Sequence, residues 1–142
     1  MKTDRYVYPA MIGREPGDER VGVIFPDLPG CVTSGETAEE ALEAAKRALS
    51  LHLWGMEDDG DEVPAPSLVE TLRAEAPWQA VALVEAWMPP VRDRMANKAV
   101  NKTLTLPRWL DEAGKRAGLN FSQVLQEGVM DRLGISHERI SA

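Results

Sequence analysis

The chain has 142 residues, a net charge of -7 and a mean hydropathy of -0.29, which fit one ordinary globular domain or two small ones. No stretch approaches the roughly 18 consecutive apolar residues of a membrane span, which excludes a transmembrane protein. Cys31 is the only cysteine, so no internal disulfide can form. Because the N-terminus also lacks the apolar core of a signal peptide, we expect a cytoplasmic protein.

The first 36 residues contain three candidate strands. Residues 6–12 are rich in strand formers, although Pro9 cannot donate a ladder hydrogen bond and indicates an edge or a bulge. A polar turn at 13–19 leads to a second strand at 20–25, close enough to the first for an antiparallel hairpin. A turn rich in proline and glycine then leads to a short third strand at 31–34.

An amphipathic helix follows the third strand. Thr37 and Glu40 have the spacing of a capping box, in which two side chains satisfy free N–H groups at a helix start. Apolar residues recur every three to four positions from Ala38 to Leu53. We therefore predict a helix that begins after Thr37 and ends near Gly55.

The N-terminal part closes with one more strand. Residues 68–76 are compatible with one short helix, and residues 80–87 suit a fourth strand that Pro89 and Pro90 end. The predicted module is thus β-β-β-α-β, a small sheet covered by one main helix.

A polar, charged stretch at 91–97 predicts a linker between two domains, residues 1–90 and 98–142. The charge changes sign at this boundary. Residues 1–90 hold 7 Lys and Arg against 17 Asp and Glu (-10), whereas residues 91–142 hold 9 against 6 (+3). The two parts are therefore expected to have separate partners, a basic one and a phosphate-bearing one.

The second domain is predicted to have one strand and two helices. The last four of residues 101–106 alternate polar and apolar side chains, as in a strand with one buried face. Pro107 ends this strand and suits the first turn of a helix at 108–117. Gly118 is expected to end that helix, and Asn120 is expected to cap a second helix.

These roughly 36 residues are too few to bury a core as a monomer. Pairing the strands of two copies across a two-fold axis gives a two-stranded ribbon and a four-helix core, so we predict an obligate homodimer. The expected dimer core consists of the inward apolar side chains Leu104, Leu106, Leu125 and Val129, together with Gly128, whose cost of about 1 kcal/mol inside a helix indicates a packing role.

The order strand, Leu-Pro, helix, Gly-Leu-Asn-x-Ser, helix resembles the ribbon-helix-helix repressors over residues 98–136. In that family the ribbon lies in the major groove of operator DNA and one of its faces reads base edges. Counting back from Pro107 places Asn101, Thr103 and Thr105 on the groove-facing side. The expected DNA partner is therefore double-stranded operator DNA.

The same resemblance implies that a DNA backbone phosphate sits at the start of the second helix. Phe121, Ser122 and Gln123 would present free backbone N–H groups there, at the positive end of the helix dipole. Two positions are not accounted for. Lys102 stands where the family has an apolar residue, and Gly114 lies inside the first helix.

The run FPDLPGCVTSGET at 25–37, followed by EEA at 39–41, closely resembles the HicB antitoxin family. With the C-terminal motif, the resemblance spans residues 5–136. It implies a degenerate ribonuclease-H-like first domain that binds and masks HicA, a small basic RNA-cleaving toxin, while the second domain represses the operon. We therefore interpret the chain as the antitoxin and autorepressor of a HicA/HicB-like system, α+β in fold class. Whether its dimers pair into tetramers stays open.

Two other functions are compatible with the residues. One is a stand-alone repressor whose first domain senses a small molecule. The other is a nuclease, which would need three or four carboxylates around two metal ions. Asp27, Glu36, Glu39 and Glu40 are available, but the first strand carries no acid. We therefore expect no enzymatic activity, no catalytic residue, no metal site and no cofactor.

Overall fold

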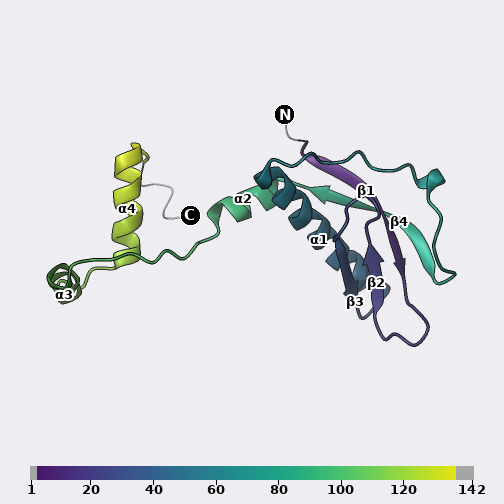
Figure 1. The fold of residues 1–142 in the computed structure, drawn as a ribbon, viewed down its shortest axis with the longest axis horizontal. Coiled ribbons are helices and arrows are strands. Elements are labelled where there is room, and N and C mark those ends of the chain that lie inside the picture. Colours follow the sequence, from purple (N-terminus) through teal and green to yellow (C-terminus); the bar gives the residue numbers. More distant parts are fainter. Residues whose placement is uncertain (1–2, 137–142) are drawn as a thin grey trace. The chain divides into compact units, whose positions relative to one another are not determined.

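The computed structural model describes residues 3–136, and the chain divides between Ala99 and Val100 into two compact units. We call the described residues 3–99 unit 1 and the described residues 100–136 unit 2. The predicted β-β-β-α-β order of unit 1 is confirmed (Figure 1). Its elements are β1 (Arg5–Gly13), β2 (Val21–Ile24), β3 (Val32–Gly35), α1 (Ala38–Asp59), a 3-10 helix (Val69–Thr71), β4 (Gln79–Trp87) and α2 (Pro89–Asn97).

The four strands form one antiparallel sheet in the order β3-β2-β1-β4. β1 pairs with β4 along its whole length, whereas β2 pairs with β1 only from Met11 to Gly13. On the β2 side, Pro9 therefore lies beyond the last paired residue. A proline, which has no N–H to donate, is tolerated in such a position, as we expected of an edge.

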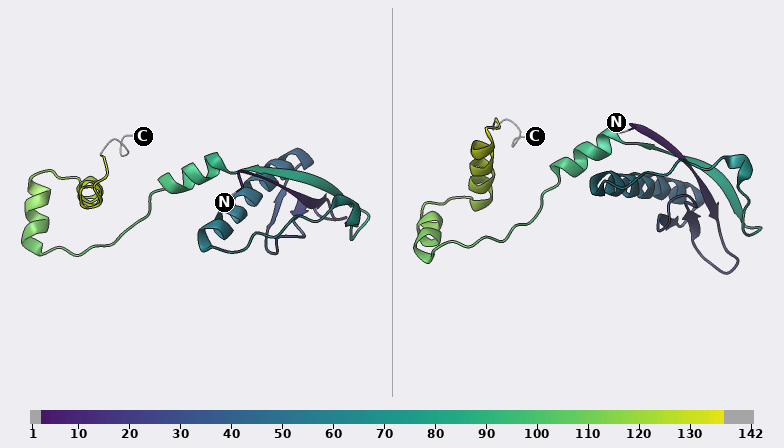
Figure 2. Two further views of the ribbon diagram at one scale, coloured as in Figure 1. Left: turned by 90° about the horizontal axis from the view of Figure 1, so that it is seen from above. Right: turned by 45° about the horizontal axis from the view of Figure 1, so that its top comes forward.

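One face of the sheet packs against α1, as both views of Figure 2 show. The face is built by alternate residues of the strands, because successive side chains point to opposite sides of a sheet. Tyr8 and Ala10 of β1 and Val84 and Ala86 of β4 are buried on it. They meet the buried stripe of α1: Ala41, Ala45, Leu49 and Leu53.

The start of α1 is fixed by side chains, as the sequence predicts. The Thr37 hydroxyl accepts a hydrogen bond from the Glu40 N–H at 3.1 Å. The Glu40 carboxylate accepts a hydrogen bond from the N–H of Glu36 at 3.2 Å, whereas in a capping box the donor is the N–H of the next residue, the N-cap.

The predicted end of α1 near Gly55 is wrong, because the helix continues to Asp59. A glycine inside a helix costs about 1 kcal/mol relative to alanine. Here Met56 packs against the core beyond Gly55, which favours continuation. Gly60, at φ 75°, ends the helix instead. Of residues 68–76, only three are helical.

The predicted linker at 91–97 is helical, and this expectation is corrected. Pro89 and Pro90 end β4, but a proline also suits the first turn of a helix, and α2 begins there. Val91 of α2 is buried and Met95 packs against the core of unit 1. The guanidinium of Arg92 binds the nearly buried carboxylate of Glu57 on α1 at 2.8 Å.

Unit 2 contains the two predicted helices, α3 (Arg108–Arg116) and α4 (Phe121–Leu133). Gly118, at φ 70°, donates to the Lys115 carbonyl at 3.1 Å and so ends α3. The side chain of Asn120 accepts from the N–H of Gln123 at 3.1 Å and caps α4. Both expected caps are confirmed. None of the helices in the described part of the chain is long and apolar enough to cross a membrane.

Candidate functional site

The segment expected to read bases, residues 101–106, precedes α3 in unit 2. All six side chains are exposed, including Leu104, which is 56% exposed. A strand is defined by hydrogen bonds to a neighbouring strand, and within the described residues of one chain this segment forms none. The exposure of Leu104 and Leu106 agrees with ribbon pairing in a dimer. The base-reading roles of Asn101, Thr103 and Thr105 stay predictions.

Unit 2 does not enclose a core by itself. Among its described residues only Gly114 is buried. Val129 is 48% and Leu133 67% exposed on α4. Most other large apolar side chains of the unit are exposed as well, among them Leu104, Leu106, Trp109, Leu110, Val124 and Leu125. Burial of such side chains is the main favourable term in folding and association, so the unit requires a partner surface.

Three of the five residues expected in the dimer core lie around one hollow of about 420 Å³ in unit 2. These are Leu104, Leu106 and Leu125. Lys102, whose place in the strand was unexplained, lines the same hollow. Gly128 and Val129 do not. A Cβ built on Gly128 would meet nothing within 4 Å among residues 3–136, so no contact in this part of the chain explains its small size.

The structure gives a reason for the glycine at position 114, which the sequence left unexplained. A Cβ at this position would lie 2.6 Å from the ring of Phe121, which is closer than real Cβ contacts come. The turn at Gly118 folds the start of α4 back onto α3, and the N–H of Leu119 donates to the Gly114 carbonyl at 3.1 Å. With any other residue at position 114, the Phe121 ring would have to move from its present place.

The start of α4 offers fewer free N–H groups than expected. The N–H of Gln123 is not free, because it donates to the Asn120 side chain. This corrects its expected role as a phosphate donor. Among the hydrogen bonds of the described residues, none uses the N–H of Phe121 or Ser122. Those two groups keep the geometry of a helix N-terminus that can bind an anion, and their role stays a prediction.

In unit 1, the run FPDLPGC is a closed loop between β2 and β3. Phe25 donates its N–H to the Cys31 carbonyl at 3.1 Å, and Cys31 donates to the Leu28 carbonyl at 3.0 Å. Gly30 has φ 87°, a conformation that favours glycine. Cys31 is buried, and burial raises the pKa of its thiol to about 11. It is a packing residue and is protonated at neutral pH.

Two of the residues considered for nuclease chemistry, Asp27 and Glu40, use their carboxylates in structural hydrogen bonds. Asp27 accepts from the N–H of Ser67 at 2.9 Å and from its hydroxyl, which ties the loop after α1 to the FPDLPGC loop. Glu40 binds the N–H of Glu36, and Glu39 is exposed in the first turn of α1. No group of three or more His, Cys, Asp or Glu side chains within residues 3–136 is arranged to hold a metal ion.

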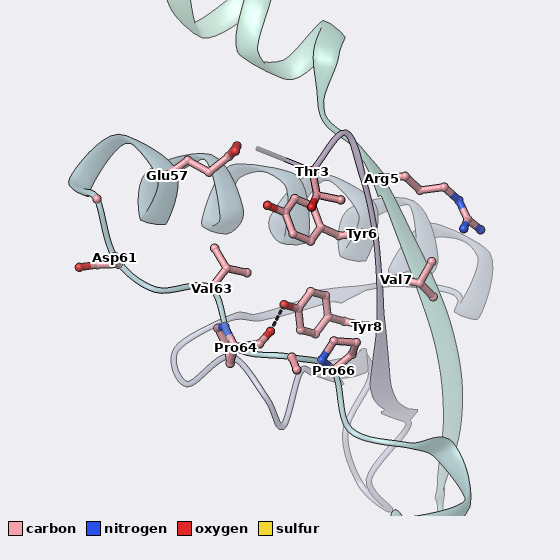
Figure 3. A pocket seen from close by; sticks show the side chains of 12 residues that line it. Thr3, Arg5, Tyr6, Val7, Tyr8, Glu57, Asp61, Val63, Pro64 and Pro66 are labelled. Atoms are coloured by element: carbon pink, nitrogen blue, oxygen red, sulfur yellow. Dashed lines mark hydrogen bonds between the residues drawn. The ribbon is translucent and has the colours of Figure 1, made fainter. Parts of the chain in front are cut away.

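A hollow of about 590 Å³ lies between β1 and the loop after α1 (Figure 3). Tyr6 and Tyr8 point into it from β1, and their ring centroids are 6.3 Å apart. The Tyr8 hydroxyl donates to the Pro64 carbonyl. Burial raises the pKa of Tyr8, and its neighbours Tyr6 and Asp27 raise it further. The tyrosine therefore stays a neutral donor.

A second hollow of about 570 Å³ adjoins the first, since Asp61 and Pro64 line both. It is acidic, being lined also by Asp27, Asp59 and Glu62. Asp59 lies in the last turn of α1, where no basic residue occurs and where an anion opposes the helix dipole. The four carboxylates that line this hollow mark it as a candidate surface for a basic partner.

A family model described as the HicB-like antitoxin of bacterial toxin-antitoxin systems matches residues 8–128. A relative called antitoxin HicB 2, from Photorhabdus laumondii, is 33% identical over 82 residues, 58% of this chain and 59% of that protein. An uncharacterized 14.9 kDa protein of Haemophilus phage HP1 is 39% identical over 64 residues, 45% of this chain and 47% of that protein. The chain thus spans about half the length of these curated relatives.

A solved structure extends the similarity to nearly the whole chain. One chain of a toxin-antitoxin complex from Streptococcus pneumoniae is 26% identical, with a TM-score of 0.58, over 90% of this chain and 99% of that one. The mixed helix and sheet architecture predicted from the sequence is therefore also the architecture of a known protein.

Proposed function

This chain belongs to the family of HicB-like antitoxins of bacterial toxin-antitoxin systems, and on that basis we propose a division of labour between its two units. Unit 1 binds and neutralises a small, basic, RNA-cleaving toxin. Unit 2 dimerises and represses the chain's own operon by binding operator DNA. The observation that carries the proposal is the contrast in burial, because unit 1 encloses a core and unit 2 exposes its apolar faces.

Dimerisation turns the exposed segment of unit 2 into a reading surface. Pairing of residues 101–106 with the same segment of a second copy buries Leu104 and Leu106, and alternation then leaves Asn101, Thr103 and Thr105 outward. Asparagine can bond adenine with two hydrogen bonds, and threonine offers a hydroxyl and a methyl group to thymine. The N–H groups of Phe121 and Ser122 supply phosphate contacts that fix the ribbon in the groove.

Charge supports the assignment of the toxin to unit 1. Residues 1–99 hold 10 Lys and Arg against 18 Asp and Glu, a net charge of -8. A basic toxin is attracted to such a surface over a distance of about 8 Å at 0.15 M salt. We assign the toxin contact to the acidic hollow, where Asp59, Asp61 and Glu62 gather around apolar side chains such as Leu28 and Met56.

The proposal is tested with the purified full chain and the product of the neighbouring short, basic reading frame. We expect the chain to stop RNA cleavage by that product and to bind a duplex from its own promoter. Asp59→Asn with Asp61→Asn should slow association with the toxin several-fold at low salt, whereas Glu15→Gln with Glu19→Gln, a matched change at another exposed turn, should not.

Two results would contradict the proposal. One is an unchanged rate of RNA cleavage in the presence of excess chain. The other is saturable binding of a small metabolite at the Tyr6 and Tyr8 hollow in a chain without a neighbouring toxin gene, which favours a ligand-sensing repressor.

A further inference from the structure

A third hollow in unit 1, of about 690 Å³, differs from the acidic hollow in its charge. It lies where the middle of α1, the end of β4 and α2 meet. Its apolar lining comes from Leu51, Trp87, Val91 and Met95. Four cationic side chains surround that lining, and we call them the basic rim: Lys46, Arg47, Arg94 and Lys98.

The basic rim is positively charged, whereas unit 1 as a whole is negatively charged. Four of the ten basic residues of the acidic segment 1–99 gather at this one place. Glu85 is the one acid in its lining, and it is already paired with Arg5 at 3.0 Å. The rim is therefore a positive patch on a negative unit.

The cations of the rim also differ from the other described arginines of unit 1 in having few partners. The side chains of Arg47, Arg94 and Lys98 have no acid or carbonyl partner within the described residues. The Lys46 ammonium group lies 3.8 Å from the Glu43 carboxylate. The remaining arginines all donate hydrogen bonds: Arg5, Arg14, Arg20, Arg73 and Arg92.

The helix dipoles favour the positions of only two of the four cations in the basic rim. Arg94 and Lys98 stand at the end of α2, where a cation is favourable. Lys46 and Arg47 lie in the middle of α1, where the dipole gives no such benefit. Like charges held together without counter-charges repel each other. Their presence in one place indicates an anionic partner.

The sequence position of the rim indicates which anion. Lys98 is three residues before Asn101, so their Cα atoms are at most about 11 Å apart, however the two units are oriented. The major groove is about 12 Å wide and is bordered by phosphates on both sides. A ribbon whose Asn101 lies in that groove therefore brings Lys98 within side-chain reach of the DNA backbone.

We propose that the basic rim of unit 1 is a second DNA-binding surface, which contacts backbone phosphates beside the sequence that the ribbon reads. This inference rests on the proposed operator binding by unit 2. The rim adds affinity without sequence preference, because phosphates carry no base information. It also gives the acidic unit 1 one face that DNA does not repel.

The test is a salt titration of operator binding by the full chain. Arg94→Gln with Lys98→Gln is compared with Arg20→Gln with Arg73→Gln, which removes the same charge from exposed positions elsewhere in unit 1. Each lost phosphate contact makes the slope of log K against log salt shallower by about 0.9, hence by roughly 3.6 for two contacts in each copy of a dimer. Affinity near 0.1 M salt should fall at least tenfold, equally on operator and on random duplex.

The control pair should keep the wild-type slope, and both pairs should keep the wild-type circular dichroism. A rim variant with the wild-type slope and affinity overturns the inference and leaves operator binding by the ribbon in place. If that variant instead loses binding to an acidic protein partner while DNA binding is unchanged, the rim serves that partner. If the wild-type chain binds no promoter duplex, the proposed function fails, and this inference fails with it.

Discussion

The two units of this chain are both small, but they differ in how they bury their apolar side chains. Unit 1 has a long helix to cover its sheet, and side chains such as Tyr8, Leu49 and Leu53 are almost fully buried. Unit 2 has two short helices and no paired strand, and among its described residues only Gly114 is buried. A short segment buries too little surface to be stable alone. Unit 1 therefore obtains its core within one chain, whereas we propose that unit 2 obtains its core from a second copy.

The largest effect is expected from charged side chains placed at the expected dimer contact, because they should disrupt unit 2 and leave unit 1 intact. Leu104→Asp with Val129→Asp should abolish the dimer and operator binding, because two carboxylates would have to be buried without partners. Unit 1 should keep its fold and its affinity for the toxin. Sedimentation of the variant reports the mass, and toxin binding reports unit 1. A variant that is still dimeric through unit 2 would refute the assigned core.

Base reading should depend on side chains that phosphate binding does not need. Asn101→Ala is expected to cost about 1–3 kcal/mol on the operator and to relax base preference at one position in each half-site. Ser122→Ala should weaken binding to all duplexes alike. Competition with single-base operator variants separates the two patterns. Sequence-blind losses from Asn101, Thr103 and Thr105 together would show that the ribbon reads no bases.

Substitutions of the two glycines inside the helices of unit 2, Gly114 and Gly128, distinguish contacts within one copy from contacts between two copies. Gly114→Ala should destabilise unit 2 by about 1–3 kcal/mol, since its Cβ would overlap the Phe121 ring. Gly128→Ala has room within one copy and should stabilise an isolated helix by about 1 kcal/mol. If α4 crosses its counterpart at Gly128, the substitution destabilises the dimer instead. Denaturant unfolding at fixed chain concentration measures both.

The smallest effect is expected in unit 1, whose core does not depend on a partner. Tyr8→Phe removes the hydrogen bond to the Pro64 carbonyl and should cost about 1 kcal/mol. Because the folded pKa of Tyr8 is raised, the unfolded chain loses this proton first, and stability falls as pH rises above the usual value of 10.0. The variant should lack that part of the pH dependence. Equal slopes of stability against pH above 10 would contradict this account.

The sequence predicted the elements whose signals are local. Thr37 and Asn120 marked the starts of α1 and α4, and both cap as expected. Runs of strand-forming residues and the turns between them located all four strands of unit 1 to within one residue at each end. Caps, strand formers and turns depend on residues a few positions apart, so they can be read from a sequence.

The features that were missed depend on distant residues. The sequence predicts a linker in place of α2, because the contacts that hold this helix are distant in the sequence. Arg92 of α2 binds Asp4 and Glu57, which are 88 and 35 residues away. Gly114 is explained by Phe121 only after the chain reverses at Gly118. The prediction of a free N–H at Gln123 conflicts with the predicted cap Asn120, because the capping side chain accepts a hydrogen bond from that same N–H.

The contrast between the units is tested most directly by amide hydrogen exchange of the full chain at low and high concentration. We expect protection in α3 and α4 to rise with concentration, because unit 2 folds only with a second copy. Protection in α1 and β4 should stay constant, because unit 1 closes its core alone. Strong protection of α3 and α4 in a dilute, monomeric sample would contradict the account.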